Sequence, residues 1–175
     1  MSKSSTQQLE KDEQKIINQL KENADESIDV IAKKCGFSRQ KVWNIIKKLE
    51  KNKTIWGYTA ICDDESYNLK HFTMLIKRTT IPLDKKTLQE ILMTRLDDLL
   101  PDAVIQIENI IYFHGCYDGI CTFLAEDIII AKKFCEQFNK RFSKFIAGVE
   151  LFEGILIIRK QSIRNPRLKE QIQFL

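Results

Sequence analysis

The chain of 175 residues is long enough for one ordinary domain or two small ones, and with 43% hydrophobic and 30% charged residues its composition is globular rather than disordered. Its polar start lacks the apolar segment of a signal peptide, and no later run approaches the length of a membrane span. We therefore expect a cytoplasmic protein with no membrane partner.

Cysteine and histidine usage argues against a bound metal. The five cysteines are an odd number without a CxxC pair, and two histidines accompany them. Free thiols within apolar patterns behave as small buried hydrophobes, and this usage fits a reducing compartment. We expect no metal site and no cofactor.

The net charge of +4 is concentrated in one stretch of the chain. Between Lys33 and Lys53 lie eight basic residues and one acid, Glu50. An excess of one sign on a single segment is the electrostatic footprint of a nucleic-acid-binding surface, whereas a merely solvated helix face usually mixes both signs.

A first helix is predicted from Leu9 to Lys21. Glu10, Asp12 and Glu13 would then lie in its first turn, where acidic side chains interact favourably with the helix dipole. A polar connection follows, and Ser27 begins the next element.

A helix-turn-helix is predicted next. Ile28 to Cys35 forms the second helix, Gly36 suits the left-handed residue that ends it, and Ser38 is a good N-cap for the third helix. Because the turn between them is so short, the two helices cross steeply, and in this arrangement the later helix enters the major groove. A plain three-helix bundle would show the same apolar spacing, but the positive charge on the third helix favours DNA.

The third helix carries the candidate DNA contacts. Val42, Ile45, Ile46 and Leu49 recur at helical spacing and define its buried stripe. The opposite face has side chains that reach base edges or phosphates. The residues expected to bind DNA are Ser38, Arg39, Gln40, Trp43 and Asn44 at the bases or groove, and Lys41, Lys47, Lys48 and Lys51 at phosphates.

Thr54 to Ile61 is rich in β-branched and aromatic residues, which predicts a short strand after the third helix. Trp43 has an alternative place, packed against this strand, which contains Trp56. The helix-turn-helix domain is therefore expected to span residues 9–61, followed by a polar linker at 62–69.

The second half has a β-α-β-β-α-β order of predicted elements. The elements are a strand at His71–Arg78, a helix from Pro82 and Asp84 to Pro101, a strand at Ala103–Phe113, a turn at 115–119, a strand at Ile120–Ala125, a helix after Asp127 that reaches Phe142, and a strand at Val149–Ile158. This order is the ferredoxin-like plan, an antiparallel sheet of four strands covered on one face by two helices.

The fold class is therefore α+β, a winged-helix-type helix-turn-helix domain followed by a ferredoxin-like βαββαβ domain at residues 70–160. Residues 161–175 form a C-terminal extension, either an arm exchanged with a partner or a frayed end. The sheet face without helices is expected to pair with a second copy, because a large exposed apolar patch is costly in water.

With both halves placed, the chain resembles the Lrp/AsnC family, the leucine-responsive, feast/famine transcription regulators, from about Asp12 to Lys160. The motifs that carry the resemblance are Phe37-Ser38, Val42, Lys47-Lys48, Leu49-Glu50 and Ile55-Trp56-Gly57-Tyr58-Thr59-Ala60 in the first half, and Gly115-Cys116-Tyr117-Asp118 in the second. Two positions depart from the family pattern: Lys53 stands where Gly is usual, and Ile45 where Arg is usual.

The resemblance implies a sequence-specific transcription regulator that binds double-stranded DNA and has no catalytic residues. It implies a homodimer formed through the second domain, assembling further to a tetramer or octamer. It also implies modulation by an amino acid or related small molecule, with Gly115, Tyr117 and Asp118 as effector-site candidates. The same three residues are also ordinary turn chemistry.

Two other classes of protein compete with this interpretation. A siroheme-type tetrapyrrole decarboxylase would share the two-domain architecture and use His and Arg in a cleft. Against it, the sequence shows two histidines and no paired carboxylates, nucleophile–base pattern or phosphate-binding glycine loop. A small-molecule-binding module without DNA activity would fit the second domain alone.

Overall fold

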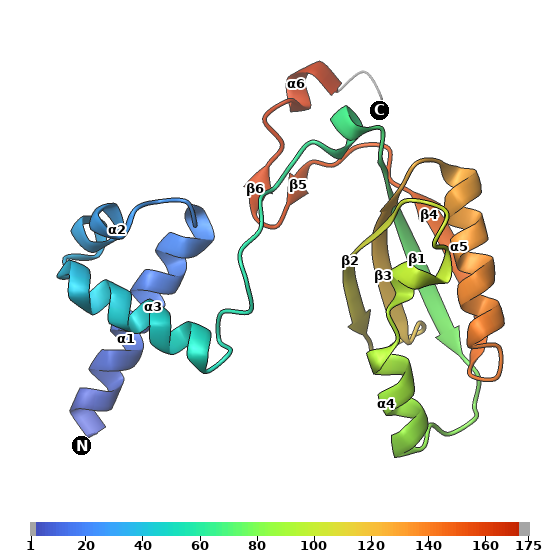
Figure 1. Ribbon diagram of the computed structural model, residues 1–175, viewed down its shortest axis with the longest axis horizontal. Helices are drawn as coiled ribbons and strands as arrows, with labels where there is room; N and C mark the ends of the chain where they lie inside the picture. The colour runs from blue at the N-terminus through green and yellow to red at the C-terminus, as the bar shows by residue number, and fades with distance from the viewer. Residues whose placement is uncertain (1–2, 172–175) are drawn as a thin grey trace. The chain divides into compact units, whose positions relative to one another are not determined.

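A computed structural model of the chain describes residues 3–171. It divides between Ala60 and Ile61 into two compact units, an all-helical first unit and a second unit built on a four-stranded sheet (Figure 1). Within residues 3–171, no helix has both the length and the apolar character needed to cross a bilayer.

The first unit consists of three helices, α1 (Lys3–Glu22), α2 (Ile28–Cys35) and α3 (Arg39–Lys51). The Ser27 and Ser38 hydroxyls accept from the third backbone N–H that follows each, at 3.4 and 3.3 Å, and cap α2 and α3 as predicted. Gly36 has the left-handed φ of 72° that ends α2. These local signals were sufficient to predict the helix-turn-helix.

The core of the first unit joins all three helices. It is formed by Ile16, Ile31, Val42, Ile45 and Leu49, each at most 5% exposed. At about 1.5–3 kcal/mol for each buried aliphatic side chain, this cluster is the main source of stability for the unit. It also fixes which side of α3 faces solvent.

The predicted start of the first helix is wrong. Helix α1 begins at Lys3 rather than Leu9, so Asp12 and Glu13 lie in its middle and not in its first turn. They are therefore not available to the N-terminal dipole and instead bind lysines of α3, as described below.

The predicted strand at 54–61 is also wrong. The Thr54 and Ile55 amides donate to the Leu49 carbonyl at 2.9 and 3.1 Å, and residues 56–63 that follow form no regular element. β-Branched residues favour extended backbone, but a strand needs a partner strand for its N–H and C=O groups, and within residues 3–171 none pairs with this segment.

The second unit has the predicted βαββαβ order. Its elements are β1 (Lys70–Arg78), α4 (Lys85–Met93), β2 (Ile105–Tyr112), β3 (Gly119–Ala125), α5 (Ile128–Arg141) and β4 (Ile146–Glu153). The sheet is antiparallel with the spatial order β2-β3-β1-β4, and α5 runs alongside it (Figure 1). This is the expected α+β, ferredoxin-like architecture.

The core of the second unit lies between the sheet and α5. The β1–β3 register places Phe72 opposite Phe123 and Met74 opposite Cys121, so all four point to the helical face. Phe134 of α5 packs on Phe123 with ring centroids 4.8 Å apart. Phe134, Phe138 and Phe142, at helical spacing on α5 and just after it, therefore belong to the core.

All five cysteines are free thiols, and two of them belong to this core. Burial raises the pKa of Cys121 to about 12 and that of Cys135 to about 11. Cys62 and Cys116 are exposed.

Two element boundaries differ from prediction. The helix predicted to reach Pro101 ends at Met93, because Thr94 has an extended backbone conformation. The Thr94 hydroxyl donates to the Glu90 carbonyl at 2.8 Å. A short 3-10 helix, η2 (Leu96–Leu99), follows. The last strand begins at Ile146 and ends at Glu153 rather than running to Ile158. At Gly154 a Cβ would lie 3.3 Å from the His71 carbonyl oxygen, so the chain passes close to β1 there.

The end of the chain folds onto the predicted linker, residues 62–69. The C-terminal elements are β5 (Arg159–Lys160), β6 (Ile163–Arg164) and α6 (Leu168–Gln171), and the linker contains the 3-10 helix η1 (Asp64–Tyr67). Arg167 pairs with Asp63, and the Lys160 ammonium lies 2.8 Å from Asp64. Residues 172–175 of the extension lie outside the described part of the chain.

Lys160 also joins this segment to the sheet. Its ammonium lies 2.6 Å from Glu108 of β2, and Glu108 in turn accepts from His71 of β1 at 2.7 Å. The hydrogen bonds from His71 and Lys160 lower the pKa of the Glu108 carboxyl against its desolvation. Desolvation opposes the charge of Lys160, but hydrogen bonds to Asp64 and Glu108 outweigh it and raise the pKa of Lys160.

Candidate nucleic-acid interface

The exposed face of α3 is set by its buried face. Val42, Ile45 and Leu49 point into the core and Ile46 packs against it, so the opposite side of the helix points to solvent. Five of the exposed residues of α3 recur at helical spacing and form one stripe: Gln40, Trp43, Asn44, Lys47 and Lys51. The sequence predicted all five, and we call them the α3 stripe.

The α3 stripe presents amides that are already oriented. The Gln40 Nε2 group donates to Asn44 Oδ1 at 3.0 Å, four residues further along the helix. Each amide keeps unused donor or acceptor capacity beyond this bond. Side-chain amides in a major-groove helix are suited to the paired acceptor and donor of an adenine edge.

The two tryptophans do not pack together. Trp43 is 45% exposed on the α3 stripe and Trp56 is 95% exposed. No strand forms at 54–61 and Trp43 is half exposed, so the alternative place for Trp43 against such a strand is wrong. Trp43 remains available to a ligand on the surface of α3.

Two of the predicted phosphate contacts hold α3 to α1. The Lys41 ammonium lies 2.6 Å from Asp12 and 4.1 Å from the centroid of the Phe37 ring. The Lys48 ammonium lies 2.6 Å from Glu13. Asp12 is 4% exposed, and the hydrogen bond from Lys41 lowers the pKa of its carboxyl. Sequence reasoning missed these pairs because the partners are 29 and 35 residues apart.

Other basic groups around α3 are freer. Arg39 meets Asp29 at 3.2 Å and Lys47 meets Glu50 at 2.8 Å, but both pairs are exposed and contribute little. Among the described residues, Lys51 has no acidic partner within 4.0 Å, nor do Lys33 and Lys53. Lys33 and Lys53 were counted in the basic stretch but not predicted as contacts.

The two departures from the family pattern have clear structural places. Ile45 is 5% exposed and packs in the core, so its side chain is part of the buried stripe of α3. Lys53 adopts the left-handed φ of 62° that Gly would take without strain.

The three effector candidates lie in the turn between β2 and β3. The Tyr117 hydroxyl donates to Glu150 of β4 at 2.8 Å, which raises the pKa of Tyr117, and the Lys77 ammonium lies 4.9 Å from the centroid of its ring. Asp118 Oδ2 accepts from the Arg78 backbone N–H at 2.8 Å. Tyr117 and Asp118 thus brace the turn that follows Gly115 against neighbouring strands.

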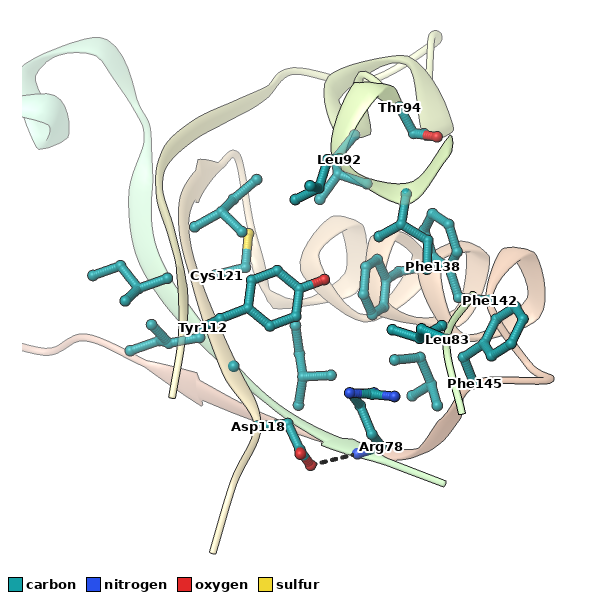
Figure 2. Close-up of a pocket in the computed structure, with 18 residues that line it drawn as sticks. Arg78, Leu83, Leu92, Thr94, Tyr112, Asp118, Cys121, Phe138, Phe142 and Phe145 are labelled. Carbon is teal, nitrogen blue, oxygen red and sulfur yellow. Dashed lines mark hydrogen bonds between the residues drawn. The ribbon is translucent and has the colours of Figure 1, made fainter. Parts of the chain in front are cut away.

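A cavity of about 230 Å³ lies beside this turn, between α4, η2, the sheet and the end of α5. We call it the α4 cavity (Figure 2). Asp118 lines it, whereas Gly115 and Tyr117 do not. Within the described part of the chain, no group of three or more His, Cys, Asp or Glu residues could hold a metal ion.

A helix-turn-helix with an exposed stripe of amides, tryptophan and lysine, followed by a ferredoxin-like unit, defines a two-domain DNA-binding protein. Comparison with known proteins agrees. Residues 13–55 match the winged helix-turn-helix DNA-binding family. This segment spans the second half of α1 together with α2 and α3.

Solved structures extend the likeness to the second unit. An AsnC family transcriptional regulator from Agrobacterium tumefaciens is 19% identical with a TM-score of 0.63, over 91% of this chain and 97% of that one. LrpC of B. subtilis is 17% identical with a TM-score of 0.59, over 85% and 95%. A transcriptional regulator from Neisseria meningitidis, solved as a complex with L-Met, is 14% identical with a TM-score of 0.64, over 91% and 97%.

No curated protein sequence matches the chain. The resemblance to the Lrp/AsnC regulators is confirmed as a likeness of fold across most of the chain, joined to a DNA-binding helix-turn-helix match in its first part. Together these findings support a transcription regulator.

Proposed function

We propose that the chain is a sequence-specific transcription regulator of the Lrp/AsnC type and not an enzyme. The observation that carries the proposal is the α3 stripe, which lies on the later helix of a segment matching DNA-binding helix-turn-helix domains. A regulator acts where the DNA is, so the proposal retains the cytoplasmic location predicted from the sequence.

Base and phosphate contacts divide along the helix. We assign Gln40, Trp43 and Asn44 to contacts with base edges. Ser38 and Arg39, at the start of α3, would lie beside the sugar-phosphate backbone of the DNA. Phosphate contacts fall to the basic residues with weak or no acidic partners, namely Lys33, Lys47, Lys51 and Lys53. Lys41 and Lys48 already hold carboxylates and add less.

The proposed active form is a homodimer that assembles further to a tetramer or octamer. Supporting this, the sheet face opposite α5 exposes apolar side chains on both edge strands, including Ile111 of β2 at 51% and Phe152 of β4 at 50%. A second copy would cover this apolar surface. Two recognition helices would then read successive major grooves of a pseudo-palindromic site. The turn containing Gly115, Tyr117 and Asp118 is the proposed site of modulation by an amino acid.

Salt-titrated DNA binding tests the proposal. Operator fragments enriched from a random-sequence pool with the purified protein should bind with an affinity that falls steeply with salt. Lys51→Ala should reduce the slope of log affinity against log salt by about 1, equally on all sequences. Asn44→Ala should leave the slope unchanged and lower discrimination between operator and mismatched DNA by about 1–3 kcal/mol.

Lys132→Ala provides the matched control, since Lys132 is an exposed lysine on α5. Its salt slope and affinity should equal those of the parent. Light scattering on the same samples gives the oligomer size with and without DNA. No retardation of DNA at low salt, or α3 variants that bind like the parent, would remove the basis of the proposal.

A further inference from the structure

The wall of the α4 cavity is mostly apolar. Rings and aliphatic chains from several elements line it, including Ile91 and Leu92 of α4, Ile110 of β2, and Phe138 at the end of α5. Cavities of about 150 Å³ with such walls stay dry and admit benzene, so about 230 Å³ accommodates a ring with a short chain attached. The cavity can hold a small apolar body.

One charged group points into this apolar space. Figure 2 shows the Arg78 guanidinium, at the end of β1, directed among Leu83, Tyr112 and Phe145. Its Nε is buried and has no hydrogen-bond partner among the described residues, and Nη2 reaches the Ile81 carbonyl at a long 3.4 Å. Within the described part of the chain, no carboxylate forms an ion pair with it.

The Arg78 Nε–H group is shielded from water without an acceptor, which is unfavourable, and a ligand that supplies an acceptor relieves the cost. A carboxylate matches the planar fork of Arg better than any neutral acceptor. Asp118 lines the same cavity, and its Oδ2 accepts a hydrogen bond from the Arg78 backbone N–H. The negative charge of this carboxylate disfavours a second carboxylate on the ligand.

Helix α4 forms a wall that can give way. It contributes no buried residue, and Leu92 is 56% exposed although it lines the cavity. An element with so little buried surface opens at low cost, which gives a ligand a route inward. A ligand in the cavity would in turn hold α4 against the sheet.

We propose that the α4 cavity binds an apolar monocarboxylate, with the carboxylate on Arg78 and the apolar body against α4 and α5. This places a ligand inside one protomer, apart from the turn residues Gly115 and Tyr117. Ligand binding itself needs no DNA. Only the idea that the ligand regulates DNA binding rests on the proposed function. Free carboxylic acids and amino acids share this chemistry, and Asp118 could accept from the ammonium of the latter.

Calorimetry on the full chain tests the site with three probes: 3-phenylpropanoate, L-phenylalanine and the neutral 3-phenylpropanol. The parent should bind the better of the two acids at least tenfold more tightly than the alcohol. Arg78→Gln should weaken both acids at least tenfold and leave the alcohol unchanged, which a merely structural role for Arg78 would not do. Arg95→Gln, at a side chain 77% exposed, is the matched control and should change nothing.

Leu92→Trp should fill the cavity and abolish binding of all three probes without unfolding, since Leu92 is half exposed. If L-phenylalanine binds more tightly than 3-phenylpropanoate and Asp118→Asn removes the difference, the ligand is an amino acid; the reverse order identifies a free acid. Binding of neither acid by folded protein, or binding indifferent to both Arg78→Gln and Leu92→Trp, overturns the site. A preparation that binds DNA but neither acid keeps the proposed function and loses this one.

Discussion

Lys53 holds a backbone conformation that its side chain disfavours. Its φ of 62° directs the chain out of α3, where the Thr54 and Ile55 amides close on the Leu49 carbonyl. For an L-residue this left-handed conformation costs about 1–2 kcal/mol. The residue supplies a charge next to the α3 stripe, so the strained conformation coincides with one of the proposed phosphate contacts.

Lys53→Gly should raise the free energy of unfolding of the first unit by about 0.5–1 kcal/mol, because relief of strain exceeds the added flexibility of the unfolded chain. Both tryptophans of the chain, 43 and 56, lie in this unit, so urea denaturation followed by their fluorescence reports on it. Lys51→Gly, within α3, should destabilise by up to about 1 kcal/mol. Equal destabilisation by the two variants would show that position 53 is not strained.

Single residues with strong local preferences were predictable from the sequence. Gly36 and Ser38 could be assigned because the left-handed end of a helix and an N-cap each select a few residue types. The packing of Trp43 against the segment that contains Trp56 could not be excluded from the sequence, because exposure depends on what else covers a position. The family pattern identified 53 and 45 as unusual but gave no physical reason.

At the scale of elements, α3 is held in place by charge as well as by its apolar stripe. Lys41 and Lys48 reach back to Asp12 and Glu13 in the middle of α1. Half of the lysines predicted to contact phosphates therefore already neutralise acids within the unit. Local spacing gave no indication of these pairs, and the early start of α1 moved both acids away from the first turn assumed from the sequence.

The Asp12–Lys41 pair makes the first unit sensitive to acid. Because Lys41 lowers the pKa of Asp12 from its ordinary 3.8, the stabilisation is complete above that value and is lost as pH falls through the lower folded-state value. Asp12→Asn should therefore be less stable than the parent near neutral pH, and the two should converge in strong acid. Tryptophan-detected urea midpoints between about pH 7 and about pH 2.5 would measure this.

The control for this prediction is Asp29→Asn, which removes an exposed pair with Arg39. Its midpoint should follow that of the parent throughout the titration. A constant gap between Asp12→Asn and the parent across the whole range would contradict the assigned role of the pair.

At the scale of the molecule, the order of strands and helices was predictable from the sequence, but the packing of the C-terminal segment against the linker was not. Alternation of apolar and turn segments was enough for the βαββαβ plan. The folding of residues 159–171 onto 62–69 depends on ion pairs between residues about a hundred positions apart, such as Arg167 with Asp63. Both segments are mostly polar. They lack the regular spacing of apolar residues from which their packing could have been predicted.

Lys160→Met should destabilise the second unit by about 2–3 kcal/mol, because it leaves Glu108 and Asp64, 13% and 14% exposed, without their shared cation. Lys70→Met removes a more exposed pair with Glu153 and should cost much less. Hydrogen exchange of the β1 and β3 amides would measure both. Similar protection in the two variants would show that Lys160 is dispensable.

The buried cysteines give the second unit a chemical property as well as a packing one. Because burial raises the pKa of Cys121 to about 12 and that of Cys135 to about 11, both thiols stay protonated at pH 7. Oxidants and alkylating reagents attack the thiolate, so these sulfurs are protected by protonation as well as by burial. Cys62 and Cys116 are exposed and react first. The slower rate at which Cys121 is modified therefore measures the rate at which the core opens.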